Sequence, residues 1–179
     1  MDDIESDIPP LPAIVGEVER TLGRMVMSFS SMESATRDAN GALLYGINEQ
    51  DVQILTSELS FRKARGVLVA LSRERLSGTE LLGRIEALMK QARSLEQRRN
   101  QLTHSVWLWL DAIDVRPRMA REKLRVSDSG RHRRAFEEFH DVGDLDRFVD
   151  EMGQVSDALF EIALALRRRG ISRSEGSPT

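Results

Sequence analysis

The stretch from Arg99 to His104, "RNQLTH", holds the side chains of this sequence best suited to chemistry. Arg99 supplies a guanidinium, Asn100 an amide and His104 an imidazole, and Arg98 directly precedes them. On an α-helix, Asn100 and His104 share a face, whereas Arg99 lies roughly 140° around the helix from His104. One helix end therefore presents an imidazole and one or two guanidiniums.

These groups suit the cleavage of RNA, which carries its own nucleophile, the 2′-hydroxyl. An imidazole can accept the proton of that hydroxyl, or donate one to the leaving 5′-oxygen, near neutral pH. A guanidinium can hold the non-bridging phosphate oxygens with two charge-assisted hydrogen bonds. A symmetric dimer that joins two copies of this helix end would supply two imidazoles around one phosphate. These residue types are therefore suited to the cleavage of RNA without a metal ion.

Structural roles for the same residues stay open. His104 also suits a helix C-cap or a core histidine, and the two arginines suit a solvated helix end near the negative pole of the helix dipole. The spacing is not specific by itself, because similar arginine–histidine spacings recur at Arg125/His132 and Arg133/His140. The alternation in "VWLWL" favours packing of Trp107 and Trp109 on a sheet over stacking on bases.

Length and composition narrow the class of protein. A chain of 179 residues fits one domain. Disulfides, thiolate nucleophiles and zinc–thiolate sites are excluded because there is no cysteine, and the three histidines lack a compact ligand spacing, so we expect no metal and no cofactor. The start, "MDDIESDIPPLP", does not resemble a signal peptide, and no apolar run approaches a membrane span. We expect a cytoplasmic protein with no membrane partner.

Apolar periodicity predicts an all-α fold. Residues 1–12 are expected to form a disordered acidic lead-in, 13–169 a single helical domain and 170–179 a flexible tail. Apolar residues recur at spacings of three and four over about 13–47, 48–75, 79–104 and 144–169, which predicts four long helices in an antiparallel bundle. The polar segment 106–142 forms an insert that favours a β-hairpin or meander, with a helix over "RRAFEEFHD" as the alternative.

Charge is unevenly distributed along the chain. Basic side chains dominate residues 116–134, and acidic ones dominate 137–151. The basic block suits either a solvated hairpin face or a guide for RNA phosphates, and the second role would make RNA binding strongly dependent on salt.

The position of "RNQLTH" at the end of the third long helix resembles the HEPN superfamily (higher eukaryotes and prokaryotes nucleotide-binding). The motif of that family is an arginine, usually followed by asparagine or another polar residue, with a histidine that closes the span. The chain looks like the RN-x-x-x-H variant, and the resemblance covers about residues 15–169 in helix order. It implies a four-helix bundle, a homodimeric ribonuclease and a role as a prokaryotic toxin or antiphage-defence effector.

The resemblance also implies roles for single residues. Arg99 and His104 would be catalytic, and Asn100 would align them. Glu33 would be the partner of the motif on the first helix. Apart from the resemblance, Arg98 and Thr103 are candidate supporting residues on the same helix as the motif.

Other functions remain as alternatives. A domain of this architecture can be a non-catalytic scaffold that binds a nucleotide or a partner protein. It can also be the toxin half of a toxin–antitoxin pair, with an antitoxin or defence-system protein as partner. A helical DNA-binding regulator is a remoter rival, because the sequence has no helix-turn-helix signature.

Overall fold

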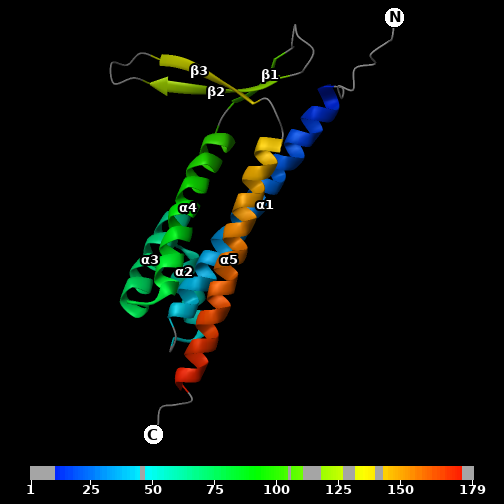
Figure 1. Ribbon diagram of the computed structural model, residues 1–179. Coiled ribbons are helices and arrows are strands. Elements are labelled where there is room, and N and C mark those ends of the chain that lie inside the picture. The colour runs from blue at the N-terminus through cyan, green and yellow to red at the C-terminus, as the bar shows by residue number, and fades with distance from the viewer. Residues whose placement is uncertain are drawn as a thin grey trace, which may run out of the picture.

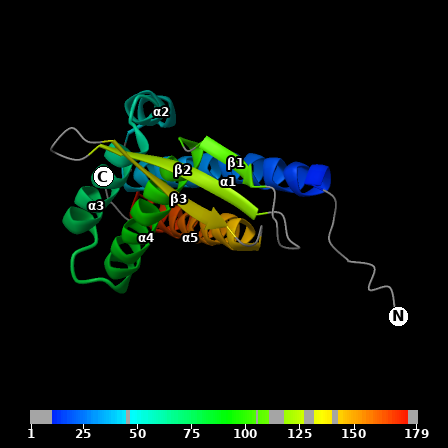
Figure 2. The same cartoon turned by 90° about the horizontal axis from the view of Figure 1, so that it is seen from above.

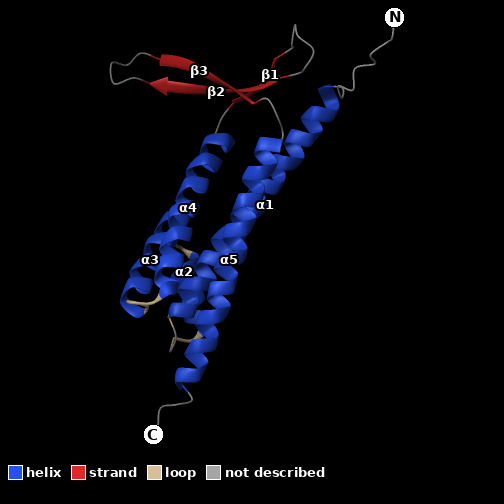
Figure 3. Ribbon diagram, in the orientation of Figure 1, coloured by secondary structure: helices blue, strands red, loops and turns tan. Residues whose placement is uncertain are grey.

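A computed structural model describes residues 11–44, 47–104, 106–110, 118–126, 132–139 and 143–174. Within these residues the chain forms five helices and three strands (Figures 1 and 3). The helices are α1 (Leu11–Leu43), α2 (Glu49–Ser57), α3 (Phe61–Arg75), α4 (Glu80–Thr103) and α5 (Gly143–Ser174). The body of the chain is helical, as the apolar periodicity predicts.

Helices α1 and α5 pack side by side along much of their lengths (Figure 1). They run parallel, because Thr21 bonds to Asp146 near the start of α5, whereas Asp38 pairs with Arg167 further along both helices. A bundle in which neighbouring helices all run antiparallel was predicted, and this pair departs from it. Helix α4 does run against α3, since Arg65 pairs with Glu96 and Arg73 pairs with Glu86.

An extra chain reversal between α1 and α3 explains the parallel pair. The single helix predicted over 48–75 is wrong, because it is interrupted between α2 and α3. Glu58 is the C-cap of α2, and the hydroxyl of Ser60 caps α3 by accepting a hydrogen bond from the backbone N–H of Lys63 at 3.4 Å. The apolar spacing of Leu55 and Leu59 continues across this break, so periodicity alone did not reveal it.

Helix α2 leads the chain back along α1. The side chain of Val52 lies next to Gly41, where an added Cβ would be 3.0 Å from its Cγ1 atom. The ring of Phe61, at the start of α3, then packs edge-on against Phe29, with centroids 5.1 Å apart. The chain has therefore run back along α1 from Leu43 to the level of Phe29 before α3 begins.

Several helix bounds differ from the predicted ones. Helix α1 begins at Leu11, inside the expected lead-in, because Pro12 falls in the first turn, where a missing N–H costs no helical hydrogen bond. It ends at Leu43, short of residue 47. Helix α5 continues through Gly170 to Ser174, inside the expected tail. The remainder of the expected lead-in and tail, residues 1–10 and 175–179, lies outside the described residues.

The core consists of apolar side chains from α1, α3, α4 and α5 that face one another. It continues to the end of α4, where Leu102 is buried within the "RNQLTH" stretch. Burial at that position fixes the rotation of the last turn of α4 and hence the directions of its polar side chains. The largest fully buried members are Met25, Met32, Leu43, Leu68, Ile85, Leu102, Leu145, Phe148, Met152, Val155, Leu159 and Ile162.

Three strands lie between α4 and α5: β1 (Val106–Leu110), β2 (Arg118–Val126) and β3 (His132–Phe139). They form an antiparallel sheet in the order β1-β2-β3, in which Trp107 is opposite Arg121 and Arg125 is opposite Arg133. The sheet lies beyond the end of the helices at which α4 ends and α5 begins (Figures 1 and 2). The helical alternative for "RRAFEEFHD" is wrong over the residues of β3, and His140 lies outside the described residues.

None of the helices in the described ranges combines the length and the apolar character needed to cross a membrane.

Candidate functional site

The last turn of α4 is closed by two residues of the motif. His104 is the C-cap, with φ −101° and ψ 15°, and its backbone N–H bonds to the carbonyl oxygen of Asn100 at 3.2 Å. The hydroxyl of Thr103 donates to the carbonyl oxygens of Arg99 and Asn100, at 3.0 and 3.4 Å. Helix ends leave carbonyl groups without helical partners, and these bonds satisfy some of them. The hydroxyl of Thr103 therefore stabilises the backbone of the motif.

Arg99 is fixed between an aromatic ring and an amide. Its guanidinium carbon lies 4.5 Å from the centroid of the Phe29 ring on α1, and Nη1 donates to Oδ1 of Asn100 at 2.9 Å. The ring attracts the cation through its quadrupole. Nε of Arg99 is buried and has no hydrogen-bond partner among the described residues. The guanidinium is thus held in place while part of its donor capacity remains unused.

Arg98 takes a different direction. Its guanidinium carbon lies 4.6 Å from the centroid of the Phe148 ring on α5, and the residue is exposed. Consecutive residues point about 100° apart on a helix, so the two arginines lie against different neighbours. Arg98 and Arg99 therefore do not form a joint phosphate clamp within one chain, and Arg98 fits the solvated helix end.

His104 is exposed at the tip of α4, and Asn100 is exposed one turn before it. No contact joins the imidazole of His104 to Arg99 in the described part of the chain. The angle of roughly 140° between their positions on the helix accounts for this separation. The chain therefore brings Arg99 and Asn100 together and leaves His104 apart from Arg99.

Glu33 does not pair with the motif. It lies half-buried on α1, one turn beyond Phe29, and within the described ranges it forms no ion pair with Arg99. The contact from α1 to the motif is the Phe29 ring. Phe29 has the spacing of an ordinary core residue, so no signal in the sequence distinguished it.

A polar groove between α3 and α4 was also not predicted. It has a volume of about 820 Å³ and reaches Asn100 at its end nearest the motif. Most of its charged side chains are basic, and some of them come from α3 and others from α4. Its lining residues are Arg62, Arg65, Gly66, Val69, Arg73, Glu86, Met89, Lys90, Arg93, Glu96, Gln97 and Asn100.

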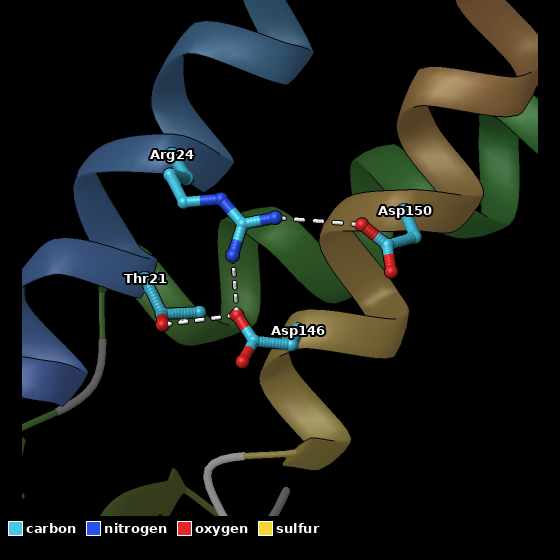
Figure 4. A network of polar contacts seen from close by, with 4 residues as sticks. All are labelled: Thr21, Arg24, Asp146 and Asp150. Atoms are coloured by element: carbon cyan, nitrogen blue, oxygen red, sulfur yellow. Dashed lines mark hydrogen bonds and ion pairs between the residues drawn. The ribbon is translucent and has the colours of Figure 1, made fainter.

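A polar network joins α1 to the beginning of α5, near the motif end of the helices (Figure 4). Asp146 accepts hydrogen bonds from the hydroxyl of Thr21 at 3.1 Å and from Nη1 of Arg24 at 2.7 Å. Nη2 of Arg24 also reaches Asp150 at 3.4 Å. Asp146 lies in the first turn of α5, where a negative charge is favoured by the helix dipole. The network therefore links α1 to the first turns of α5.

The described residues contain no group of three or more histidine, cysteine, aspartate or glutamate side chains arranged to hold a metal ion. The arrangement at the end of α4 offers an imidazole, a positioned guanidinium and an amide.

Comparison with protein-family models, with curated proteins and with solved structures gave no match to this chain.

Proposed function

We propose that this chain is a metal-independent endoribonuclease of HEPN type that acts as a homodimer. Arg99 binds the scissile phosphate, His104 is the general acid and base, and Asn100 aligns the guanidinium. The observation that supports this most is the way Arg99 is held: stacked on the Phe29 ring, bonded to Asn100 and close in sequence to an exposed imidazole. A prepositioned cation stabilises developing negative charge without having to reorganise.

The proposed reaction uses the nucleophile of the substrate. The 2′-oxygen attacks phosphorus and its proton passes to one imidazole, while the bond from phosphorus to the 5′-oxygen breaks and that oxygen takes a proton from a second imidazole. The products are a 2′,3′-cyclic phosphate and a 5′-hydroxyl. Negative charge rises on the non-bridging oxygens, and the guanidinium of Arg99 binds them.

The geometry of one chain supports the proposed homodimer. His104 and Arg99 point in different directions around α4, so one chain does not place both against the same phosphate. A two-fold axis close to the tip of α4 would bring His104 of one protomer near Arg99 of the other and would supply the second imidazole. The exposure of His104 is compatible with such a contact.

The biological role that we propose is that of a cytoplasmic toxin or antiphage-defence effector in a prokaryote, held inactive by an antitoxin or a defence-system protein. This role rests on the resemblance of "RNQLTH" and its helix order to the HEPN superfamily. The helix that carries the motif is the third long one, because α2 has only nine residues.

One observation favours a second function, a non-catalytic scaffold that binds a nucleotide or a partner protein. Nε of Arg99 is buried and the rest of the guanidinium already contacts Phe29 and Asn100. In a scaffold these contacts would serve only to join α4 to α1.

Variants at the motif separate the two functions. Purified protein is incubated with mixed RNA in excess chelator, as wild type, His104→Ala, Arg99→Ala and Arg98→Ala. If the chain is a nuclease, His104→Ala and Arg99→Ala should abolish RNA cleavage, and circular dichroism should show that both variants remain folded. Arg98→Ala should still cleave RNA. Full activity of His104→Ala excludes the proposed mechanism, and folded wild-type protein without any activity favours the scaffold.

A further inference from the structure

The groove between α3 and α4 has more positive than negative charge. Five basic residues line it, against Glu86 and Glu96. Both glutamates are already paired, with Arg73 and Arg65, each at 2.7 Å. The other three cations, Arg62, Lys90 and Arg93, are exposed and have no acidic partner in the described part of the chain. The groove therefore presents three uncompensated positive charges.

The basic residues that α4 contributes to the groove lie on the same face of the helix as Asn100 and His104. On α4 the lining residues Lys90, Arg93, Gln97 and Asn100 recur at spacings of three and four, so they form one stripe along the helix. His104 follows Asn100 by four residues and extends the same stripe to the tip of α4. The groove thus leads along α4 toward the exposed imidazole.

Helix α3 supplies the opposite wall. Because α3 and α4 are antiparallel, with Arg65 opposite Glu96, Arg62 lies one turn nearer the motif end. Gly66 also lines the groove, and an added Cβ there would meet nothing within 4 Å. The absence of a side chain at Gly66 leaves open space in this wall.

We propose that the groove between α3 and α4 binds the sugar–phosphate backbone of single-stranded RNA and leads it to Asn100 and His104. Arg62, Lys90 and Arg93 contact its phosphates. A flexible strand can follow a groove between two packed helices, whereas the rigid A-form duplex presents its phosphates on a broad surface. This inference names the path of the substrate and rests on the proposed nuclease function.

Removal of the three charges tests the path. RNA with 2′-O-methyl groups cannot be cleaved through the 2′-oxygen, so its binding is measured separately from catalysis. Each phosphate contact with a single strand contributes about 0.7 to the slope of log affinity against log salt. The triple variant Arg62→Gln, Lys90→Gln, Arg93→Gln is expected to lower that slope by about 2, and the affinity at 0.1 M salt by roughly a hundredfold.

The matched control removes the same charges elsewhere. Arg20, Lys63 and Arg84 are exposed and do not line the groove. The variant Arg20→Gln, Lys63→Gln, Arg84→Gln has the same net charge as the groove variant and is expected to keep most of the salt slope. An equal loss in both variants would mean that RNA responds only to total charge, and this would overturn the inference.

A steric variant tests the groove without a change of charge. Gly66→Met adds a flexible side chain to the open wall and replaces a poor helix former with a good one. We expect weaker RNA binding with no loss of stability. Gly83→Met on α4 is the control, since Gly83 is exposed, has no atom within 4 Å of an added Cβ and lies outside the groove. Unchanged RNA affinity in Gly66→Met would contradict an occupied groove.

The results distinguish this inference from the proposed function. Cleavage by wild type together with unchanged binding by the groove variants would overturn the path and leave the nuclease standing. Groove-dependent RNA binding without any cleavage would support the path and overturn the nuclease. Competition by polyglutamate as strong as that by RNA, or tighter binding of duplex RNA, would overturn single-stranded RNA as the occupant.

Discussion

Replacement of Phe29 by leucine should lower RNA cleavage although Phe29 touches no substrate. The ring lies under the guanidinium of Arg99 at 4.5 Å and is 5% exposed. Phe29→Leu keeps an apolar side chain in the core and removes the aromatic face. Arg99 then loses its attraction to the ring and becomes free to adopt other rotamers. Phe29 is thus a positioning residue for the proposed catalytic arginine.

The size of the effect follows from the contact. A cation–π pair contributes about 0.5–1 kcal/mol when exposed and about 2 kcal/mol when desolvated. Arg99 is half-buried, so we take about 1 kcal/mol, which corresponds to roughly a fivefold loss in kcat/KM if the contact is needed in the transition state. The core change, including the lost edge-on contact with Phe61, should lower the free energy of unfolding by about 1.5–3 kcal/mol.

Phe148→Leu is the matched control. That ring is fully buried and lies 4.6 Å from the guanidinium carbon of Arg98, so the same chemical change is made under the neighbouring arginine. Cleavage of a labelled RNA is measured in chelator, at a temperature where both variants are folded. We expect Phe148→Leu to be destabilised and to retain wild-type kcat/KM, because Arg98 has no proposed part in the chemistry.

Two results would refute this reasoning. One is wild-type cleavage by Phe29→Leu, and the other is an equal loss in Phe148→Leu. A test independent of catalysis is a double-mutant cycle in urea with Phe29→Leu and Arg99→Gln. It should give a coupling free energy of about 1 kcal/mol, and a coupling near zero would show that the ring does not hold the arginine.

Three further changes test the fold. Gly66→Ala should raise the free energy of unfolding by about 0.5–1 kcal/mol, because glycine loses more backbone entropy within a helix and the added methyl meets no atom; a lower melting temperature would contradict this. Ser72→Ala should be neutral or stabilising in chemical denaturation, because Ser72 is fully buried and its hydroxyl has no partner among the described residues. Asp146→Asn should lower the free energy of unfolding by about 1 kcal/mol at low salt and by less in 1 M salt. The variant loses an exposed ion pair with Arg24 and a favourable negative charge at the start of α5, and salt screens both interactions. A loss of stability that does not depend on salt would contradict this explanation.

The elements that could be predicted are those specified by local sequence. Asn48 was expected to cap a helix, and its Oδ1 accepts a hydrogen bond from the backbone N–H of Asp51 at 2.8 Å. Helix α4 also follows its predicted bounds, from the N-cap Thr79 to the C-cap His104. The division between α2 and α3 was missed because the apolar spacing continues through residues 58–60. A capping hydroxyl at Ser60 decides that break, and serine also occurs within helices of this chain.

The candidate site likewise has features that the local sequence specifies and features that depend on how distant helices pack. The bond between Arg99 and Asn100 joins neighbours in the chain, so the sequence places both side chains correctly at one helix end. The stacking on Phe29 joins residues seventy positions apart, and it depends on how α1 crosses α4. The groove likewise depends on which side chains α3 and α4 turn toward each other, and the predicted antiparallel order of the helices does not specify this. Glu33 was chosen for its charge, whereas the structure brings an aromatic side chain of α1 to the motif.

The most direct test of the central claim is the chemistry of the RNA ends. Wild type and His104→Ala are incubated in chelator with an oligoribonucleotide and with the same oligonucleotide 2′-O-methylated at the cleavage position. We predict a 2′,3′-cyclic phosphate and a 5′-hydroxyl from wild type, no cleavage at the methylated position and no product from His104→Ala. Products with 3′-hydroxyl ends, or cleavage at the methylated position, would contradict the account.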